Sequence, residues 1–79
     1  MSTETQLIAE TKKWLKKAEA EFKKTKPKGT KGTDFAKNIA AYLNDTKYFS
    51  KKKDYVRAFE AVIWAWAWIE IGRETKILE

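Results

Sequence analysis

The sequence has no cysteine and no histidine among its 79 residues. Without cysteine, neither a disulfide framework nor a thiolate nucleophile is possible, and without both residues the common zinc and iron sites lack their ligands. The missing histidine also removes the usual base that activates a serine or threonine nucleophile. We therefore expect a protein that is not an enzyme and that holds no metal and no cofactor.

Proline and glycine are scarce, with one proline and three glycines, and no segment shows the alternating pattern of a strand. The proline and two of the three glycines lie together in TKPKGTKG at residues 25–32, which predicts a loop. The glycine spacing is not that of a phosphate-binding loop, and no strand precedes it. The chain is long enough for one domain, residues 1–79, and not for two.

Long apolar runs are absent as well. The longest, Ala61 to Ile69, falls far short of the roughly 20 residues that span a bilayer. The first residues, MSTETQ, have neither the basic start nor the apolar stretch of a signal peptide. We expect a cytoplasmic protein that does not bind a membrane.

Apolar residues recur every three or four positions in three segments, which predicts helices at about residues 3–24, 34–51 and 54–76. Thr3 with Gln6 fits a capping box for the first helix, Thr33 or Asp34 an N-cap for the second, and Asp54 an N-cap for the third. The short link between the last two makes them antiparallel neighbours. The predicted fold is all-α, an up-and-down three-helix bundle.

The third helix carries apolar residues nearly all round. One face is expected to form the core with the second helix, and it holds Tyr55, Phe59, Val62, Ile63, Trp66 and Ile69, with Ala58 and Ala65 at its edge. A different face holds Trp64, Trp68 and Ile71. These three side chains are either buried where the third helix crosses the other two, or exposed as a partner interface. We favour an interface with an unidentified protein partner or a second copy, because tryptophan is enriched at binding hot spots.

The charge is uneven, with +8 on residues 1–53 and −2 on residues 54–79, giving the net +6. Fifteen of the seventeen cations are lysine, although arginine is better suited to bidentate phosphate contacts. The simplest interpretation is that these lysines form a basic surface exposed to solvent. The alternative function is non-specific nucleic-acid binding, with possible contacts from Lys12, Lys13, Lys16, Lys17, Lys23 and Lys24.

One carboxylate invites a chemical hypothesis. Glu70 follows the apolar stripe of the third helix, near Trp66 and Ile69, and an acid beside an aromatic surface can act as a general acid or base. The simpler interpretation, which we favour, is an edge carboxylate that pairs with Arg73, a lysine or a tyrosine.

Residues 47–72, KYFSKKKDYVRAFEAVIWAWAWIEIG, combine an aromatic helix end, a tight Lys-Asp-Tyr turn and an alanine-rich helix with alternating tryptophans. This stretch resembles the signature of a family of small archaeal proteins, domain of unknown function 357. The resemblance implies a three-helix up-and-down bundle. It brings no activity and no catalytic residue that could be assigned to this chain.

Overall fold

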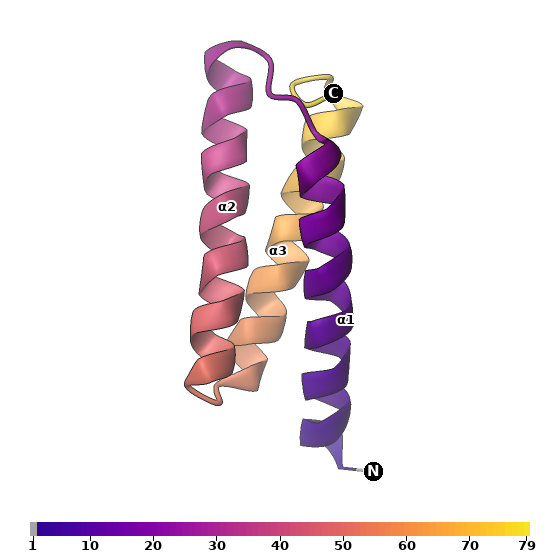
Figure 1. The fold of residues 1–79 in the computed structure, drawn as a ribbon, viewed down its shortest axis with the longest axis vertical. Coiled ribbons are helices and arrows are strands. Elements are labelled where there is room, and N and C mark those ends of the chain that lie inside the picture. The colour runs from indigo at the N-terminus through magenta and orange to yellow at the C-terminus, as the bar shows by residue number, and fades with distance from the viewer. Residues whose placement is uncertain (1) are drawn as a thin grey trace.

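The computed structural model describes residues 2–79 and contains three helices, α1 (Thr3–Lys24), α2 (Gly29–Lys51) and α3 (Tyr55–Glu74). The helices run up, down and up as an elongated bundle (Figure 1). Within residues 2–79 there is no strand, only an isolated bridge between Pro27 and Leu78. The predicted all-α three-helix bundle is confirmed. Met1, which the predicted domain includes, lies outside the described residues.

Helix α3 is the centre of the bundle. Helices α1 and α2 both pack extensively on α3, and they make far fewer contacts with each other. Figure 1 shows α1 and α2 standing in front with α3 behind them. One side of α3 is therefore covered by two helices, and its other side is left without a covering helix.

The buried side of α3 is made mostly of small residues. Its buried positions are Ala58, Ala61, Val62, Ala65, Ile69 and Gly72. They pack against a core that includes Ala18 of α1, Ile39 and Leu43 of α2, and Leu78. Small side chains at a helix crossing let the two backbones approach closely, so the larger side chains of α3 must lie beside this stripe.

The predicted core face of α3 was wrong at Ile63. Ile63 is 43% exposed, whereas Ala58 and Ala65, which we had placed at the edge, are fully buried. Phe59 and Trp66 are half-buried and flank the core. The reason is that α3 is rotated to bring its small residues to the point of closest approach, which turns Ile63 away from α2.

The helix boundaries agree with the prediction at α1 and differ at α2. The N-cap of α1 is Ser2 and not Thr3, since the Ser2 hydroxyl accepts a hydrogen bond from the Thr5 N–H at 3.1 Å. Asp54 caps α3 as predicted, accepting from the Arg57 N–H at 3.3 Å. Helix α2 begins at Gly29, so part of the predicted loop is helical.

The C-terminal tail explains this early start of α2. Backbone hydrogen bonds join Lys26 to Glu79 in both directions and Lys28 to Ile77, which fastens the tail to the α1–α2 connection. Gly32 is buried beneath this contact, and a Cβ atom there would lie 2.7 Å from the Ile77 carbonyl oxygen. The absence of a side chain at Gly32 therefore lets the tail reach the first turn of α2.

None of the helices formed by residues 2–79 combines the length and the apolar character that crossing a membrane requires.

Candidate functional site

The uncovered side of α3 presents large apolar side chains to solvent. Val56 is 62% exposed, Ile63 43%, Trp64 52% and Ile71 42%. We call these four residues the outer face. They are spaced seven or eight positions apart along two neighbouring rows, which keeps them on one side of a helix with 3.6 residues per turn. The outer face is thus an apolar strip opposite the core, and the exposed carboxylate of Glu60, between Val56 and Trp64, interrupts it.

The structure separates the three residues predicted to form a partner interface. Trp64 and Ile71 belong to the outer face, although Trp64 also stacks on Tyr42 of α2, with ring centroids 6.4 Å apart. Trp68 is half-buried and meets Phe35 of α2 edge-to-face at 5.1 Å. Trp68 lies four residues after Trp64, and that step turns it roughly 40° around the helix. This turn brings Trp68 toward α2.

The two inward-turned tryptophans differ in their polar contacts. Trp66 donates its Nε1–H to the Trp14 carbonyl oxygen at 3.1 Å and meets the Trp14 ring edge-to-face at 5.7 Å. The buried Nε1 of Trp68 has no hydrogen-bond partner among the described residues. A buried N–H without an acceptor weakens the packing that surrounds it. Trp66 therefore anchors α1 to α3 more firmly than Trp68 anchors α2.

Carboxylates lie within the outer face and beside it, with Glu60 between its apolar side chains. Glu60, Glu70 and Glu74 are all exposed on α3, and Arg57 is exposed while pairing with Asp54 at 3.1 Å. Because Glu70 is exposed, it lacks the enclosed apolar setting that the general-acid hypothesis requires. The pairing of Glu70 with Arg73 that we favoured from the sequence was wrong, because Arg73 pairs with the Glu21 carboxylate of α1.

One ionic cluster joins α1 to the end of α3. Arg73 donates to the Glu21 carboxylate at 2.9 Å and to the Glu21 carbonyl oxygen at 3.3 Å, and Lys24 donates to the same carboxylate at 3.0 Å. The hydrogen bonds from Lys24 and then Arg73 lower the pKa of Glu21 below its usual value. This cluster fixes helix packing and lies away from the outer face.

A scan with family models gives a match over residues 7–78 to a family described as "Protein of unknown function (DUF357)". The chain belongs to this family. The DUF357 chain is also similar to a crystal structure of a family member from Archaeoglobus fulgidus, with 46% identity and a TM-score of 0.90. That match covers 99% of this chain and 97% of the other. Among curated proteins no match was found.

The basic residues of the DUF357 protein lie on its surface, and several of them are engaged. Lys13 pairs with Glu10 at 3.6 Å, and Lys24 pairs with Glu21. Lys13 and Lys17 also lie over the Trp14 ring, at 5.5 and 4.9 Å from its centroid. The remaining candidates for nucleic-acid contacts, Lys12, Lys16 and Lys23, are exposed on α1 as well.

Across residues 2–79, no three acidic side chains lie close enough together to hold an ion.

Sequence reasoning identified Trp64 and Ile71 of the outer face and missed Val56 and Ile63. The sequence shows that Val56 and Ile63 are apolar. It does not show that the small residues of α3 face the other two helices, which leaves Val56 and Ile63 on the uncovered side.

Proposed function

We propose that this DUF357 protein is a non-enzymatic association module that forms a homodimer through the outer face of α3. The observation that supports this proposal is the exposure of four large apolar side chains on one side of the central helix. Large exposed apolar patches usually mark interaction sites, and tryptophan is common among the residues that dominate binding. The cytoplasmic location expected from the sequence is part of the same proposal.

An antiparallel pair of α3 helices suits the outer face. A two-fold axis brings the same surface of both copies together. If that axis passes between Ile63 and Trp64, then Val56 of one copy faces Ile71 of the other, because both lie equally far from the midpoint. The same axis brings the two copies of Trp64 close together. Each large apolar side chain of the outer face then meets another one.

Sedimentation equilibrium tests the dimer. At about 100 µM, a chain with a micromolar dimer Kd is mostly associated, so we expect the mass of two chains. Trp64→Glu places a charge in the centre of the interface and should give a folded monomer. Tyr48→Glu is the matched control, because Tyr48 is 56% exposed on α2 and lies outside the outer face. A monomeric wild-type chain at this concentration would remove the proposal's main support.

Non-specific nucleic-acid binding is the competing function, and the same protein sample tests it. If the lysines only solvate the surface, binding to duplex or single-stranded nucleic acid should be weak and should vanish near physiological salt. Trp64→Glu should leave this weak binding unchanged except for the small effect of its charge. Sub-micromolar affinity that persists at physiological salt would favour nucleic-acid binding over association.

A further inference from the structure

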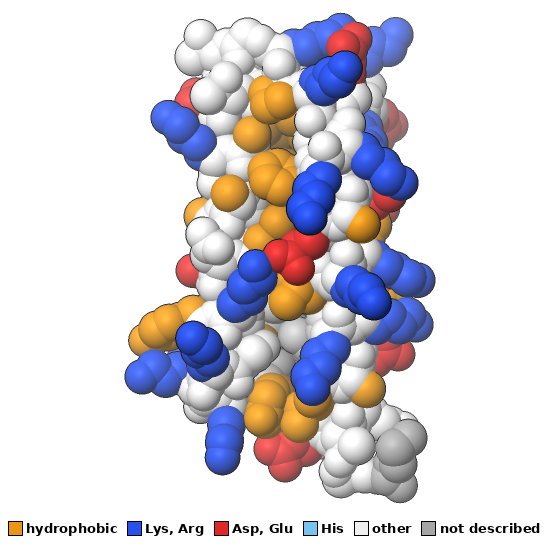
Figure 2. Space-filling model, viewed as in Figure 1, with side chains coloured by type: hydrophobic (Ala, Val, Ile, Leu, Met, Phe, Trp, Pro, Cys, Tyr) orange, Lys and Arg blue, Asp and Glu red, His pale blue; other side chains and the backbone are white. Residues whose placement is uncertain are grey.

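A second surface lies on the opposite side of the bundle. Helices α1 and α2 make few contacts with each other, and two cavities lie between them; we call these two cavities together the groove. Figure 2 shows apolar side chains along the middle of this face, with lysine side chains on both sides. The groove contains no residue of the outer face, so an occupant here is independent of the proposed dimer.

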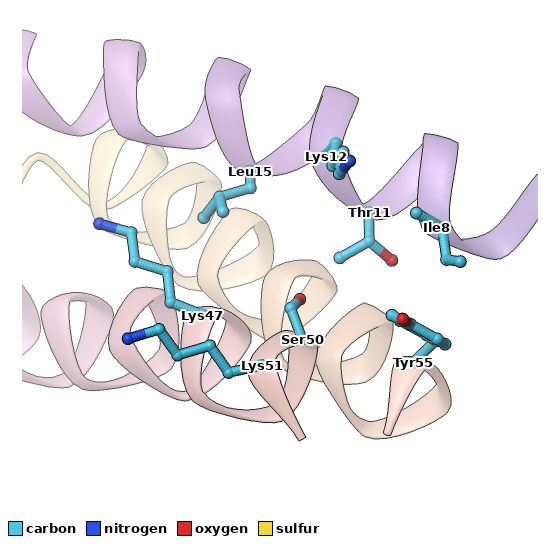
Figure 3. Close-up of a pocket in the computed structure, with 8 residues that line it drawn as sticks. All are labelled: Ile8, Thr11, Lys12, Leu15, Lys47, Ser50, Lys51 and Tyr55. Carbon is cyan, nitrogen blue, oxygen red and sulfur yellow. The ribbon is translucent and has the colours of Figure 1, made fainter. Parts of the chain in front are cut away.

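The groove has an apolar floor over about four turns of α1. Its larger cavity, about 510 Å³, contains Ile8 and Leu15 of α1 and ends at Tyr55 (Figure 3). Its smaller cavity, about 190 Å³, contains Phe22 of α1 and Leu43 of α2. From the first of these α1 residues to the last, the length is roughly 21 Å at 1.5 Å per residue. The floor is therefore long and narrow.

The rim of the groove is basic on both sides. Lys12 and Lys23 project from α1, and Lys47 and Lys51 project from α2. Glu19 of α1 also lines the groove and forms a salt bridge with Lys47 across it at 2.6 Å. Exposed salt bridges of this kind contribute little stability, so a carboxylate from an occupant can replace Glu19 as the partner of Lys47 at little cost.

We propose that this groove binds an acidic amphipathic helix of another protein, which lies between α1 and α2 as a fourth helix. The apolar face of such a helix covers the floor, and glutamates or aspartates on its two flanks meet the lysines of the rim. A helix of about four turns matches the length of the groove.

The shape of the groove favours a helix over a lipid chain. Sites for small ligands bury about 70 to 90% of the ligand surface. The two cavities of this groove face solvent, and only the Lys47–Glu19 salt bridge crosses it among the described residues, so a fatty acid would keep one side of its chain in water. A helix instead places polar residues on the side that remains exposed.

A second copy of the chain is the other occupant with suitable chemistry, because the exposed side of α3 also carries Glu60, Glu70 and Glu74. The outer face and the groove lie on opposite sides of one molecule, however. Copies joined in this way would form an open chain of growing length and not a closed dimer. A measurement of mass distinguishes this arrangement from a heterologous complex.

The test uses the full-length chain and a fluorescein-labelled synthetic peptide of 16 residues, with leucine at helical spacing and glutamate on both flanks. Fluorescence anisotropy at physiological salt should show saturable binding at one peptide per chain, and circular dichroism should show an increase in helicity. A control peptide with glutamine in place of every glutamate should bind at least about tenfold more weakly, because it lacks the charges that meet the rim.

Matched variants localise the binding. Lys12→Glu/Lys51→Glu reverses two rim charges and should weaken peptide binding at least about tenfold. Lys13→Glu/Lys17→Glu changes the net charge of the chain by the same amount, but its two residues lie on α1 outside the groove. This variant should weaken peptide binding less than about threefold. All four lysines are exposed, so both variants are expected to fold, which circular dichroism checks.

Four results with the labelled peptide would overturn the proposal. The acidic peptide could fail to bind at about 100 µM, or the glutamine peptide could bind as tightly as the acidic one. The two double variants could lose the same affinity for the peptide. Stoichiometric palmitate could displace the peptide, which would assign the groove to a lipid. Growth of the unliganded chain into species larger than a dimer, reversed by Lys12→Glu/Lys51→Glu, would assign the groove to a second copy.

Discussion

On the buried side of α3 most side chains are small, and on the exposed side they are large. The buried positions include three alanines and one glycine, namely Ala58, Ala61, Ala65 and Gly72. The exposed positions include a valine, two isoleucines and a tryptophan, which form the outer face. Hydrophobicity alone would place the larger residues inside. The side of α3 that meets the other helices is the side whose small residues leave room for a close helix crossing, although it also holds Val62 and Ile69.

The flanks of α3 show where the larger residues find space. Trp66 packs against Trp14 of α1, and Trp68 packs against Phe35 of α2, both edge-to-face. Each pair lies beside the stripe of small residues, where the helix surfaces diverge. The small residues of α3 thus pack against large aliphatic residues such as Ile39, Leu43 and Leu78, with aromatic residues at the flanks, and the remaining apolar residues of α3 are left on the outer face.

Two isoleucines on α3 give the strongest test of this contrast. Ile69 is fully buried and Ile63 is 43% exposed. Ile69→Ala should reduce the free energy of unfolding by about 2 to 5 kcal/mol, because it leaves a cavity in the core. Ile63→Ala should change it by no more than about 0.5 kcal/mol.

Urea unfolding followed by circular dichroism measures both values. The protein must be dilute enough to be monomeric, since a dimer through the outer face would add its own stability to the wild-type chain. Similar losses for the two variants would show that both sides of α3 are packed, and the contrast between them would be lost.

Trp64 and Trp68, which the sequence analysis placed on one face of the third helix, should respond differently to substitution. Trp68→Glu brings a carboxylate into a half-buried position against Phe35 and should cost at least about 2 kcal/mol of unfolding free energy. Trp64→Glu, at 52% exposure, should cost less and leave the chain folded. Thermal unfolding compares the two variants directly. If Trp64→Glu is the more destabilising, the stacking on Tyr42 is part of the core.

Gly72 tests how closely the small side of α3 is packed. A Cβ atom at this position would lie 2.5 Å from Leu78 Cδ1 and 3.3 Å from Phe35 Cδ2. Gly72→Ala should therefore cost about 1 to 3 kcal/mol, although alanine favours a helix more than glycine does. In the double variant with Leu78→Ala the clash disappears, so the two losses should not add. Additive losses would mean that Leu78 does not contact this side of α3.

The sequence was sufficient for the elements that depend on local patterns. The three-residue and four-residue spacing gave the three helices, and Asp54 before an apolar run gave the N-cap of α3. The short turn before Asp54 also gave the antiparallel pairing of α2 and α3. These features rest on neighbours in the chain, which a single sequence displays.

The features that escaped prediction depend on contacts between distant residues. Leu78 enters the core because the tail pairs with the α1–α2 connection, and this pairing also extends α2 back to Gly29. Nothing close to Leu78 in the sequence signals that pairing. Ile63 was misplaced for a related reason, since only the packed bundle shows that α3 presents its alanines and Gly72 to the other helices.

The smallest expected effect concerns the ionic cluster at the end of α3, where the buried side meets α1. Lys24 and Arg73 lower the pKa of Glu21 below 4.5, so Glu21 holds its proton less tightly in the folded chain than in the unfolded one. Its contribution to stability is present above the unfolded pKa and is lost as the pH falls through the folded pKa. Carbon-detected NMR titration should give the Glu21 carboxyl a pKa below its usual range. Lys24→Gln or Arg73→Gln should raise this pKa.

Glu21→Gln should accordingly lower stability at neutral pH and flatten the loss of stability between neutral pH and about pH 3. Glu10→Gln is the matched control, because Glu10 lies on the same helix but pairs only with Lys13, at 3.6 Å and within α1. That substitution should leave the acid unfolding profile nearly unchanged, since an exposed pair within one helix is weak. Equal responses of the two variants would mean that Arg73 does not join α3 to α1 in solution, and that the end of α3 is held by Gly72 and Leu78 alone.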